Sequence, residues 1–297
     1  MSSTGPALSI LYRGPLSSCN YHCDYCPFAK HESPPEELKD DELGLARFVD
    51  WVSSAERQIS VLFTPWGEGL VRPWYREAML TLSAMPHVRR VAIQTNLSAP
   101  VDWLEKADRQ KIALWATYHP TQTPYEKFLA KCRRLAAMNV RYSVGLVGLV
   151  ENLAVAQRLR AELPDGVYFW INAFKSAGPS YYPSEVEAAY AELDPHFVVN
   201  NQSHPSLGRT CRTGASVLSV DGDGNLRRCH FVKTVLGNLY RDELSSILRE
   251  RPCPEQTCGC FIGYVHLDAL SLYREFGDGV LERIKTPSSR EDPHGAC

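Results

Sequence analysis

Three cysteines near the start of the chain, Cys19, Cys23 and Cys26, have the spacing of a metal site. They lie in the run C-N-Y-H-C-D-Y-C, with three and then two residues between them. Cysteine thiolates hold cubane iron–sulfur clusters, which contain four irons. Three thiolates on one short loop leave one iron without a protein ligand, free to bind a substrate or a cofactor. The spacing therefore predicts an iron–sulfur centre with an open coordination position.

Two other interpretations of these cysteines stay open. Zinc takes Cys and His ligands tetrahedrally, so His22 or His31 could complete a zinc site. His22 is adjacent to Cys23, however, and would have to share a very tight loop. Disulfides are the second alternative, but three is an odd number of cysteines. The apolar stretch before them is also too short for a secretory signal.

The composition is typical of a cytoplasmic enzyme. The chain has 297 residues, a net charge of −2 and a pI of about 6.5. We therefore expect neither a nucleic-acid partner nor a membrane partner. No apolar run approaches the roughly 18 residues of a membrane span. Ten cysteines in a reducing compartment are expected to bind metal rather than to form disulfides.

Short β-rich runs alternate with helical patterns up to about residue 190. The expected strands are Leu8–Tyr12, Ile59–Phe63, Val91–Gln94, Ile112–Thr117, Arg141–Val147 and Tyr168–Asn172. The expected helices are Glu42–Ala55, Trp74–Ser83, Asp102–Ala107, Tyr125–Met138, Leu153–Leu163 and Ser184–Leu193, with a loop over Lys30–Asp41. This alternation predicts an α/β fold with a parallel sheet. Six units are fewer than the eight of a complete barrel.

Further polar groups follow the later strands. In parallel α/β folds, ligands bind at the carboxyl ends of the strands. Gly67 and Glu68 follow the second strand in T-P-W-G-E-G-L, Asn96 ends the third in Q-T-N, and His119 follows the fourth in T-Y-H-P. Ordinary structural roles stay open for them: an exposed turn, a helix N-cap and a buried histidine.

The cysteine spacing, with Tyr25 just before the last cysteine, closely resembles the radical S-adenosylmethionine (SAM) superfamily. The resemblance implies a partial (β/α)6 barrel, a [4Fe-4S] cluster on three cysteines, and SAM bound at the open iron. One electron then splits SAM and yields a 5′-deoxyadenosyl radical, which abstracts a substrate hydrogen. Gly67 and Glu68 resemble the Gly-Gly-Glu motif that holds the SAM amino group, although Trp66 replaces the first glycine. We expect Asn96, His119 and Tyr25 to be further cofactor-binding residues.

A second group of cysteines begins after residue 204. Cys211 and Cys229 flank two short β-runs, Ser216–Val220 and Asn225–His230, which are joined by the turn sequence D-G-D-G. Cys253, Cys258 and Cys260 follow in C-P-E-Q-T-C-G-C. A hairpin with cysteines at both ends can present two thiolates to one metal centre.

This segment resembles the SPASM or twitch extensions of radical SAM enzymes, which hold auxiliary iron–sulfur clusters. A full SPASM domain has seven cysteines, whereas five are present here. Five suffice for one auxiliary [4Fe-4S] cluster, and the residue that is not a ligand stays open among Cys253, Cys258 and Cys260. Structural zinc is the alternative. We expect a barrel over residues 1–195, a small cysteine-rich β-hairpin/α domain over 196–285 and a disordered tail over 286–297.

The sequence thus predicts a cytoplasmic radical SAM enzyme that acts on a peptide or a small molecule. An electron donor such as flavodoxin or ferredoxin is the implied partner. An auxiliary cluster favours an oxidative outcome, in which the substrate radical gives up an electron. The alternative is a non-catalytic zinc protein that serves as an interaction module.

Overall fold

The computed structural model describes residues 5–28, 31–178 and 180–285, and strands and helices alternate through its first two thirds. The strands are β1 (Gly5–Arg13), β2 (Arg57–Phe63), β3 (Val88–Thr95), β4 (Ile112–Tyr118), β5 (Arg141–Gly148) and β6 (Phe169–Ala173). The helical segments are α1 (Pro35–Ser53), α2 (Pro73–Ala84), η2 (Asp102–Lys106), α3 (Tyr125–Ala137), α4 (Leu153–Glu162) and α5 (Ser184–Leu193). The predicted α/β alternation is confirmed.

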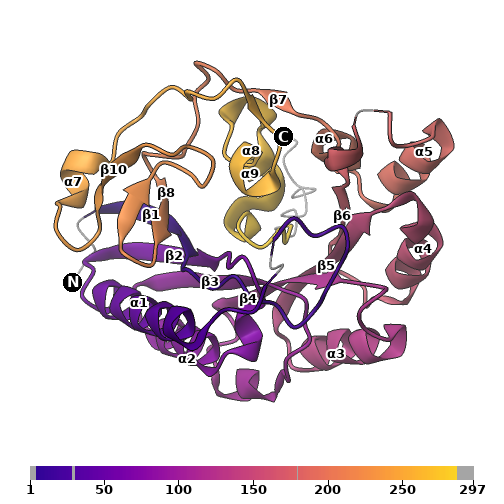
Figure 1. Cartoon of the computed structure of the whole chain (residues 1–297), viewed down its shortest axis with the longest axis horizontal. Coiled ribbons are helices and arrows are strands. Elements are labelled where there is room, and N and C mark those ends of the chain that lie inside the picture. Colours follow the sequence, from indigo (N-terminus) through magenta and orange to yellow (C-terminus); the bar gives the residue numbers. More distant parts are fainter. Residues whose placement is uncertain (1–4, 29–30, 179, 286–297) are drawn as a thin grey trace, which may run out of the picture.

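The strands form one curved sheet, which Figure 1 shows with α1 to α5 around its outer side. Within the described residues its order is β10-β9-β8-β1-β2-β3-β4-β5-β6. Neighbouring strands from β8 to β6 run parallel, as in a partial barrel. The expected hairpin is β8 (Val217–Asp221) and β9 (Asn225–Arg227), followed by β10 (Val235–Asn238). Because β8 pairs with β1, the hairpin extends the barrel sheet rather than forming a sheet of its own.

The first helix begins earlier than the sequence pattern predicted. We expected a loop over Lys30–Asp41 and a helix from Glu42, but α1 starts at Pro35. Proline is well tolerated at the first helical position, where its missing N–H would have no partner. Glu36 and Glu37 in the first turn interact favourably with the positive end of the helix dipole. The proline pair and the polar residues after it therefore start a helix instead of extending the loop.

Two apolar layers cover the two faces of the curved sheet. The outer layer packs the strands against the helices, with residues such as Ile10, Phe48 and Phe63. The inner layer joins the concave face to the end of the chain, where Trp115 and Trp170 contact residues from Phe261 onward. Figure 1 shows these last segments, α8 (Phe261–Tyr264) and α9 (Leu272–Phe276), within the curve of the sheet. The C-terminal segments therefore complete the core of the partial barrel.

A buried carboxylate links the end of the C-terminal segment to two strands of the sheet. Glu282 is fully buried and lies 3.3 Å from the Nε of Arg90 and 3.3 Å from the Nη2 of Arg141. Ser143 donates a hydrogen bond to the Glu282 carbonyl oxygen at 2.6 Å. Burial raises the pKa of Glu282, and the two guanidinium groups oppose that rise. Strands β3 and β5 and the C-terminal segment are thus joined through one charge.

No helix among the described residues combines the length and the apolar character needed to cross a membrane.

Removing the Glu282 carboxylate should strongly destabilise the protein. In Glu282→Ala, Arg90 and Arg141 lose their buried counter-charge, which should lower the free energy of unfolding by about 3–5 kcal/mol. Chemical denaturation measures this change. Arg89→Ala is the matched control, because its ion pair with Asp278 is exposed and should be worth less than about 1 kcal/mol. Equal effects of the two substitutions would contradict the buried role of Glu282.

Candidate active site

The three N-terminal cysteines line a cavity at the carboxyl ends of the strands. The loop that carries them follows β1 and leads into α1. The cavity has a volume of about 410 Å³. It is lined by Cys19, Tyr21, His22, Cys23, Asp24, Cys26, Phe28, Pro65, Trp66, Gly67, Glu68, Gln94, Thr95, Asn96, Thr117 and His119. Most of the residues that the sequence singled out on this rim therefore meet in one place.

The cysteine loop is held against the end of β2 by direct backbone contact at Gly67. A Cβ atom on Gly67 would lie 1.7 Å from the carbonyl oxygen of Ser18, the residue before Cys19. The N–H of Glu68 donates a hydrogen bond to the same oxygen at 3.2 Å. Only glycine allows this approach, because any side chain would overlap the loop backbone. The second glycine of the predicted motif thus positions the first cysteine.

Ser33 closes the base of the cysteine loop. Its hydroxyl oxygen accepts hydrogen bonds from the N–H groups of Ser17 and Ser18, at 3.4 Å and 3.2 Å, and donates to Glu37 at 2.6 Å. Ser17 donates to the same Glu37 oxygen at 2.7 Å. His31, a candidate zinc ligand in the sequence analysis, places its Nε2 2.8 Å from the Ser17 hydroxyl. The two ends of the loop are therefore joined to each other and to the first turn of α1.

Glu68 joins the ends of β2 and β3. Its carboxylate is buried and accepts hydrogen bonds from Leu70 N at 3.0 Å, Thr95 Oγ1 at 2.7 Å and Asn96 N at 2.6 Å. Burial raises its pKa to about 6, although these hydrogen bonds oppose the rise. A carboxylate offers about four acceptor positions. Three are filled, so Glu68 builds the rim and can accept one more donor from the cavity.

The cysteine sulfurs have donors and an imidazole nearby. Tyr21 N lies 3.4 Å from the Cys19 sulfur, and the Asn96 amide donates to the same sulfur at 3.7 Å. His119 Nδ1 lies 3.3 Å from the Cys23 sulfur and 2.7 Å from the Tyr25 hydroxyl. Burial lowers the pKa of His119 to about 4, so its ring is neutral at neutral pH. Tyr25 therefore does not line the cavity itself, and its hydroxyl contacts His119, which does.

Backbone hydrogen bonds and close packing connect parts of the chain that carry the C-terminal cysteines. The backbone of Cys253 pairs with Gly208 and Arg209, just before Cys211. A Cβ on Gly263 would lie 2.8 Å from the Cys258 sulfur and 2.9 Å from the ring of Phe231, two residues after Cys229. The pKa of Cys258 is raised by burial and then by interaction with Cys229, Cys260, Cys211 and Cys253. Cys258 therefore lies close enough to the other four cysteines of this segment to interact with them electrostatically.

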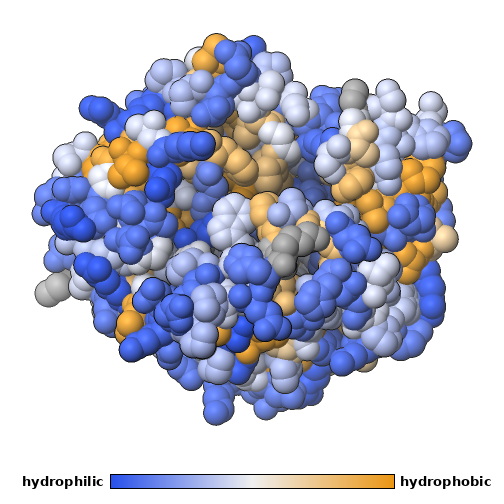
Figure 2. Space-filling model, viewed as in Figure 1, coloured by the Kyte–Doolittle hydropathy of each residue, from blue (hydrophilic) through white to orange (hydrophobic). Residues whose placement is uncertain are grey.

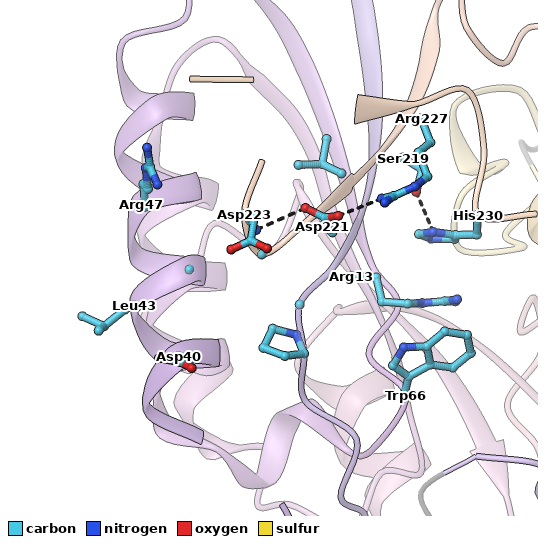
Figure 3. A pocket seen from close by; sticks show the side chains of 15 residues that line it. Arg13, Asp40, Leu43, Arg47, Trp66, Ser219, Asp221, Asp223, Arg227 and His230 are labelled. Carbon is cyan, nitrogen blue, oxygen red and sulfur yellow. Dashed lines mark hydrogen bonds and ion pairs between the residues drawn. The ribbon is translucent and has the colours of Figure 1, made fainter. Parts of the chain in front are cut away.

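The larger cavity of the rim, about 700 Å³, contains residues that sequence reasoning did not select. It lies between α1 and the β8–β9 turn and is lined by Arg13, Trp66 and His230, among others. Figure 3 shows the Arg13 side chain along the Trp66 ring, with a separation of 3.9 Å between Cζ and the ring centroid. His230 lies 2.6 Å from Ser219 Oγ and 2.9 Å from Thr64 Oγ1. Trp66 lines both cavities. Arg13 directly follows the expected first strand, so the sequence could have predicted that this residue lies at the rim.

The residue types in both groups of cysteines are those that bind iron–sulfur clusters. Each group is rich in thiols, and the N-terminal group has N–H donors directed at sulfur, which stabilise a thiolate. Among the described residues, no group of three or more His, Cys, Asp or Glu side chains is close enough together to hold a single metal ion.

Comparisons with known proteins relate the N-terminal part of the chain to one family. Residues 15–150 match the model of the radical SAM superfamily. No curated protein matches the sequence. Among solved structures, native anSMEcpe with bound AdoMet and Cp18Cys peptide has a TM-score of 0.53 and 15% identity, covering 82% of this chain and 80% of that chain. Native anSMEcpe with bound AdoMet has a TM-score of 0.54 and 14% identity, with the same coverage. BtrN in complex with AdoMet and 2-DOIA has a TM-score of 0.44 and 18% identity, covering 81% of each chain. The likeness to anSMEcpe shows a shared fold.

A methyl group at Gly67 should displace the cysteine loop. Gly67→Ala should lower the free energy of unfolding by about 1–3 kcal/mol, because the added Cβ meets backbone that cannot rotate away. Chemical denaturation measures this, and faster amide hydrogen exchange at Ser18 and Cys19 would report the loop itself. Gly259→Ala is the control, because its nearest neighbour is the rotatable hydroxyl of Ser203 at 3.2 Å. A Gly67→Ala protein as stable as the control would show that the contact is not tight.

The buried carboxyl of Glu68 should make stability depend on pH. Its pKa rises from an ordinary 4.5 to about 6 on folding. The folded state therefore favours the protonated form, and this contribution is lost as the pH rises from 4.5 through 6. The free energy of unfolding of the wild type, minus that of Glu68→Gln, should fall by about 2 kcal/mol between about pH 4 and pH 7. A constant difference would contradict the raised pKa.

Proposed function

We propose that this chain, whose residues 15–150 match the model of the radical SAM superfamily, cleaves SAM reductively and abstracts a hydrogen atom from a peptide or small-molecule substrate. Cys19, Cys23 and Cys26 would hold a [4Fe-4S] cluster. The single observation that carries the proposal is their meeting with Gly67, Glu68 and Asn96 around one cavity at the strand ends. When bound, the cluster and SAM supply a one-electron cleavage that gives methionine and a 5′-deoxyadenosyl radical.

The residues around the cavity bind and orient rather than react. The free acceptor position of Glu68 suits the ammonium group of SAM, since a charge-assisted hydrogen bond is among the stronger kinds. Asn96 donates to the Cys19 sulfur and so favours its thiolate form. The neutral ring of His119 adds no positive charge beside Cys23.

Aromatic side chains beside the cavity would serve the chemistry by partial confinement. A primary carbon radical attacks nearby C–H bonds unless it is confined, and exclusion of water limits side reactions. The rings of Phe28 and Trp66 pack with their centroids 4.5 Å apart at a tilt of 46°, and both residues line the cavity. This aromatic pair would shield the radical on one side of the cavity.

The C-terminal cysteines would hold an auxiliary [4Fe-4S] cluster in a SPASM- or twitch-like segment. Their grouping around Cys258 supports this. The reduced state of both centres requires an electron donor such as flavodoxin or ferredoxin, as would be present in the cytoplasm. Whether the substrate radical then loses an electron, as the sequence predicts, or regains a hydrogen atom depends on the groups beside these cysteines.

Iron analysis and SAM cleavage test the proposed function together. After anaerobic reconstitution the wild type should contain about eight irons per chain, since each cubane has four. Replacing Cys19, Cys23 and Cys26 by Ala should leave about four. The reduced wild type with SAM alone should slowly release 5′-deoxyadenosine, and the triple variant should release none.

Cys132→Ala is the control for these measurements. Its side chain is fully buried in α3, so both the iron content and the release of 5′-deoxyadenosine should be unchanged. Zinc without iron in anaerobically purified protein would support the interaction module instead and would overturn the enzyme.

A further inference from the structure

The larger cavity of the rim has no part in the proposed function. Its volume of about 700 Å³ falls within the roughly 300–1,000 Å³ of small-molecule sites. Its walls are the end of β1, helix α1 and the β8–β9 hairpin. Figure 2 shows mostly hydrophilic surface at the lower left of the molecule, where Figure 1 places α1. The cavity therefore suits a polar ligand.

Close backbone packing holds the walls of the larger cavity in place. A Cβ on Gly44, in α1, would lie 3.0 Å from the Gly222 carbonyl oxygen in the hairpin turn. A Cβ on Gly222 would in turn lie 3.0 Å from the Cδ of Pro15. Asp221 orders the same turn, because its carboxylate accepts a hydrogen bond from the N–H of Asp223 at 3.1 Å. The walls are therefore built into the fold before any ligand binds.

The charged side chains around the larger cavity balance one another in number. Those among the described residues are Arg13, Asp40, Arg47, Asp221, Asp223 and Arg227. Arg227 pairs with Asp221 at 2.7 Å. Arg47 is exposed and lies over the ring of Tyr240, with Cζ 3.9 Å from the centroid. Because a phosphate dianion would be repelled by the aspartates, this balance favours a ligand with a single negative charge.

Arg13 is the cation in this cavity that is best placed to bind a ligand. Its Nε donates to the Thr64 carbonyl oxygen at 2.6 Å, which is its only hydrogen bond to the described residues. Its Cζ lies 3.9 Å from the centroid of the Trp66 ring, a cation–π contact that restricts the guanidinium. Burial lowers its pKa to about 10, so the group stays charged at neutral pH. Nη1 and Nη2 thus remain as a bidentate donor.

The neighbours of Arg13 hold it in this position. Figure 3 shows the Arg13 side chain between Trp66 and His230. His230 Nδ1 lies 2.6 Å from Ser219 Oγ, and its Nε2 lies 2.9 Å from Thr64 Oγ1. Both ring nitrogens of His230 are therefore occupied by hydroxyl groups. The guanidinium of Arg13, in contrast, keeps N–H groups that a ligand can use.

Trp66 connects Arg13 with the smaller cavity, which the three N-terminal cysteines line. It stands before Gly67, where the resembled Gly-Gly-Glu motif has its first glycine. A glycine at this position would offer no ring to support a guanidinium. Because Trp66 lines both cavities, a ligand bound at Arg13 can extend along the ring toward the smaller cavity. The residues that line the smaller cavity do not include Arg13, so SAM is not its expected ligand.

We propose that the larger cavity is a substrate site, in which Arg13, supported by Trp66, binds a carboxylate of the substrate through Nη1 and Nη2. This rests on the proposed function for the smaller cavity, where SAM would bind. Two parallel N–H···O bonds match a planar carboxylate and discriminate against a neutral amide. The carboxylate anchors one part of the substrate while another part passes Trp66 and meets the 5′-deoxyadenosyl radical. An acidic peptide side chain and a small carboxylic acid share this chemistry.

Chemical modification of Arg13 in the wild type tests the site without turnover. Phenylglyoxal reacts with accessible guanidinium groups, and peptide mass spectrometry measures the rate at Arg13 in reconstituted protein that already contains SAM. The peptide acetyl-Gly-Asp-Gly-amide, or butyrate, should slow this reaction severalfold, and the more effective of the two identifies the source of the carboxylate. The matched peptide acetyl-Gly-Asn-Gly-amide should leave the rate unchanged.

Four results of this experiment would overturn the proposal. Equal protection by the Asp and Asn peptides would exclude recognition of a carboxylate. Protection by inorganic phosphate but by neither carboxylate would assign the site to another anion. Protection by SAM alone would place Arg13 in the SAM site. An Arg13 that phenylglyoxal does not modify in the absence of ligand would not face the cavity.

Two matched substitutions separate the bidentate donor from the overall charge. In Arg13→Gln, the dissociation constant of the better carboxylate, measured by saturation-transfer NMR, should rise about tenfold or more. Arg47→Gln removes the same charge from the exposed mouth and should change it less than about fivefold. Equal effects would contradict the assignment. None of these readouts needs a reductant, so a protein that releases 5′-deoxyadenosine but binds no carboxylate would refute this inference alone.

Discussion

The close approach of two backbones, at Ser18 and Gly67, is the constraint on which the site depends. A loop of thiols can serve a metal centre only if its position relative to the rest of the rim is fixed. Here the Ser18 carbonyl oxygen occupies the space where a Cβ of Gly67 would stand and accepts the N–H of Glu68. Glu68 in turn holds the end of β3 through Thr95 and Asn96. One contact therefore links the cysteine loop to two strand ends.

The parallel order of the sheet makes this contact possible and extends it. In the register of β1, β2 and β8, Tyr12 lies opposite Phe63 on one side and Val220 on the other. The carboxyl ends of these strands therefore meet at one rim, and the hairpin that leads to Cys229 begins there. The two groups of cysteines lie far apart in the sequence. Cys19, Cys23 and Cys26 follow β1 at this rim, whereas Cys229 follows β9 and Cys258 lies in β11 (Thr257–Cys258), which pairs with β7 (His204–Pro205) in a separate two-stranded sheet. The buried Glu282 then holds the C-terminal segment within the curve.

The sequence predicted the strands well because each parallel strand is buried on both faces and reads as a short apolar run bounded by polar residues. Helix α1 was misjudged because a proline pair and acidic residues resemble a loop, although proline and glutamate also favour the first turn of a helix. The position of Gly67 and Glu68 after β2 could be predicted, but the three hydrogen bonds of Glu68 could not, since they depend on the register with β3. For the same reason, the contact of Arg13 with the Trp66 ring could be found only in three dimensions.

The central claim is that Cys19, Cys23 and Cys26 leave one iron open to SAM, and electron paramagnetic resonance of the reduced protein tests it most directly. The account predicts that adding SAM changes the spectrum of one reduced cluster and leaves that of the other unchanged. In the protein with Cys19, Cys23 and Cys26 replaced by Ala, the SAM-sensitive signal should be missing and the other should remain. A wild-type spectrum that does not respond to SAM, or a response that persists in the triple variant, would contradict the account.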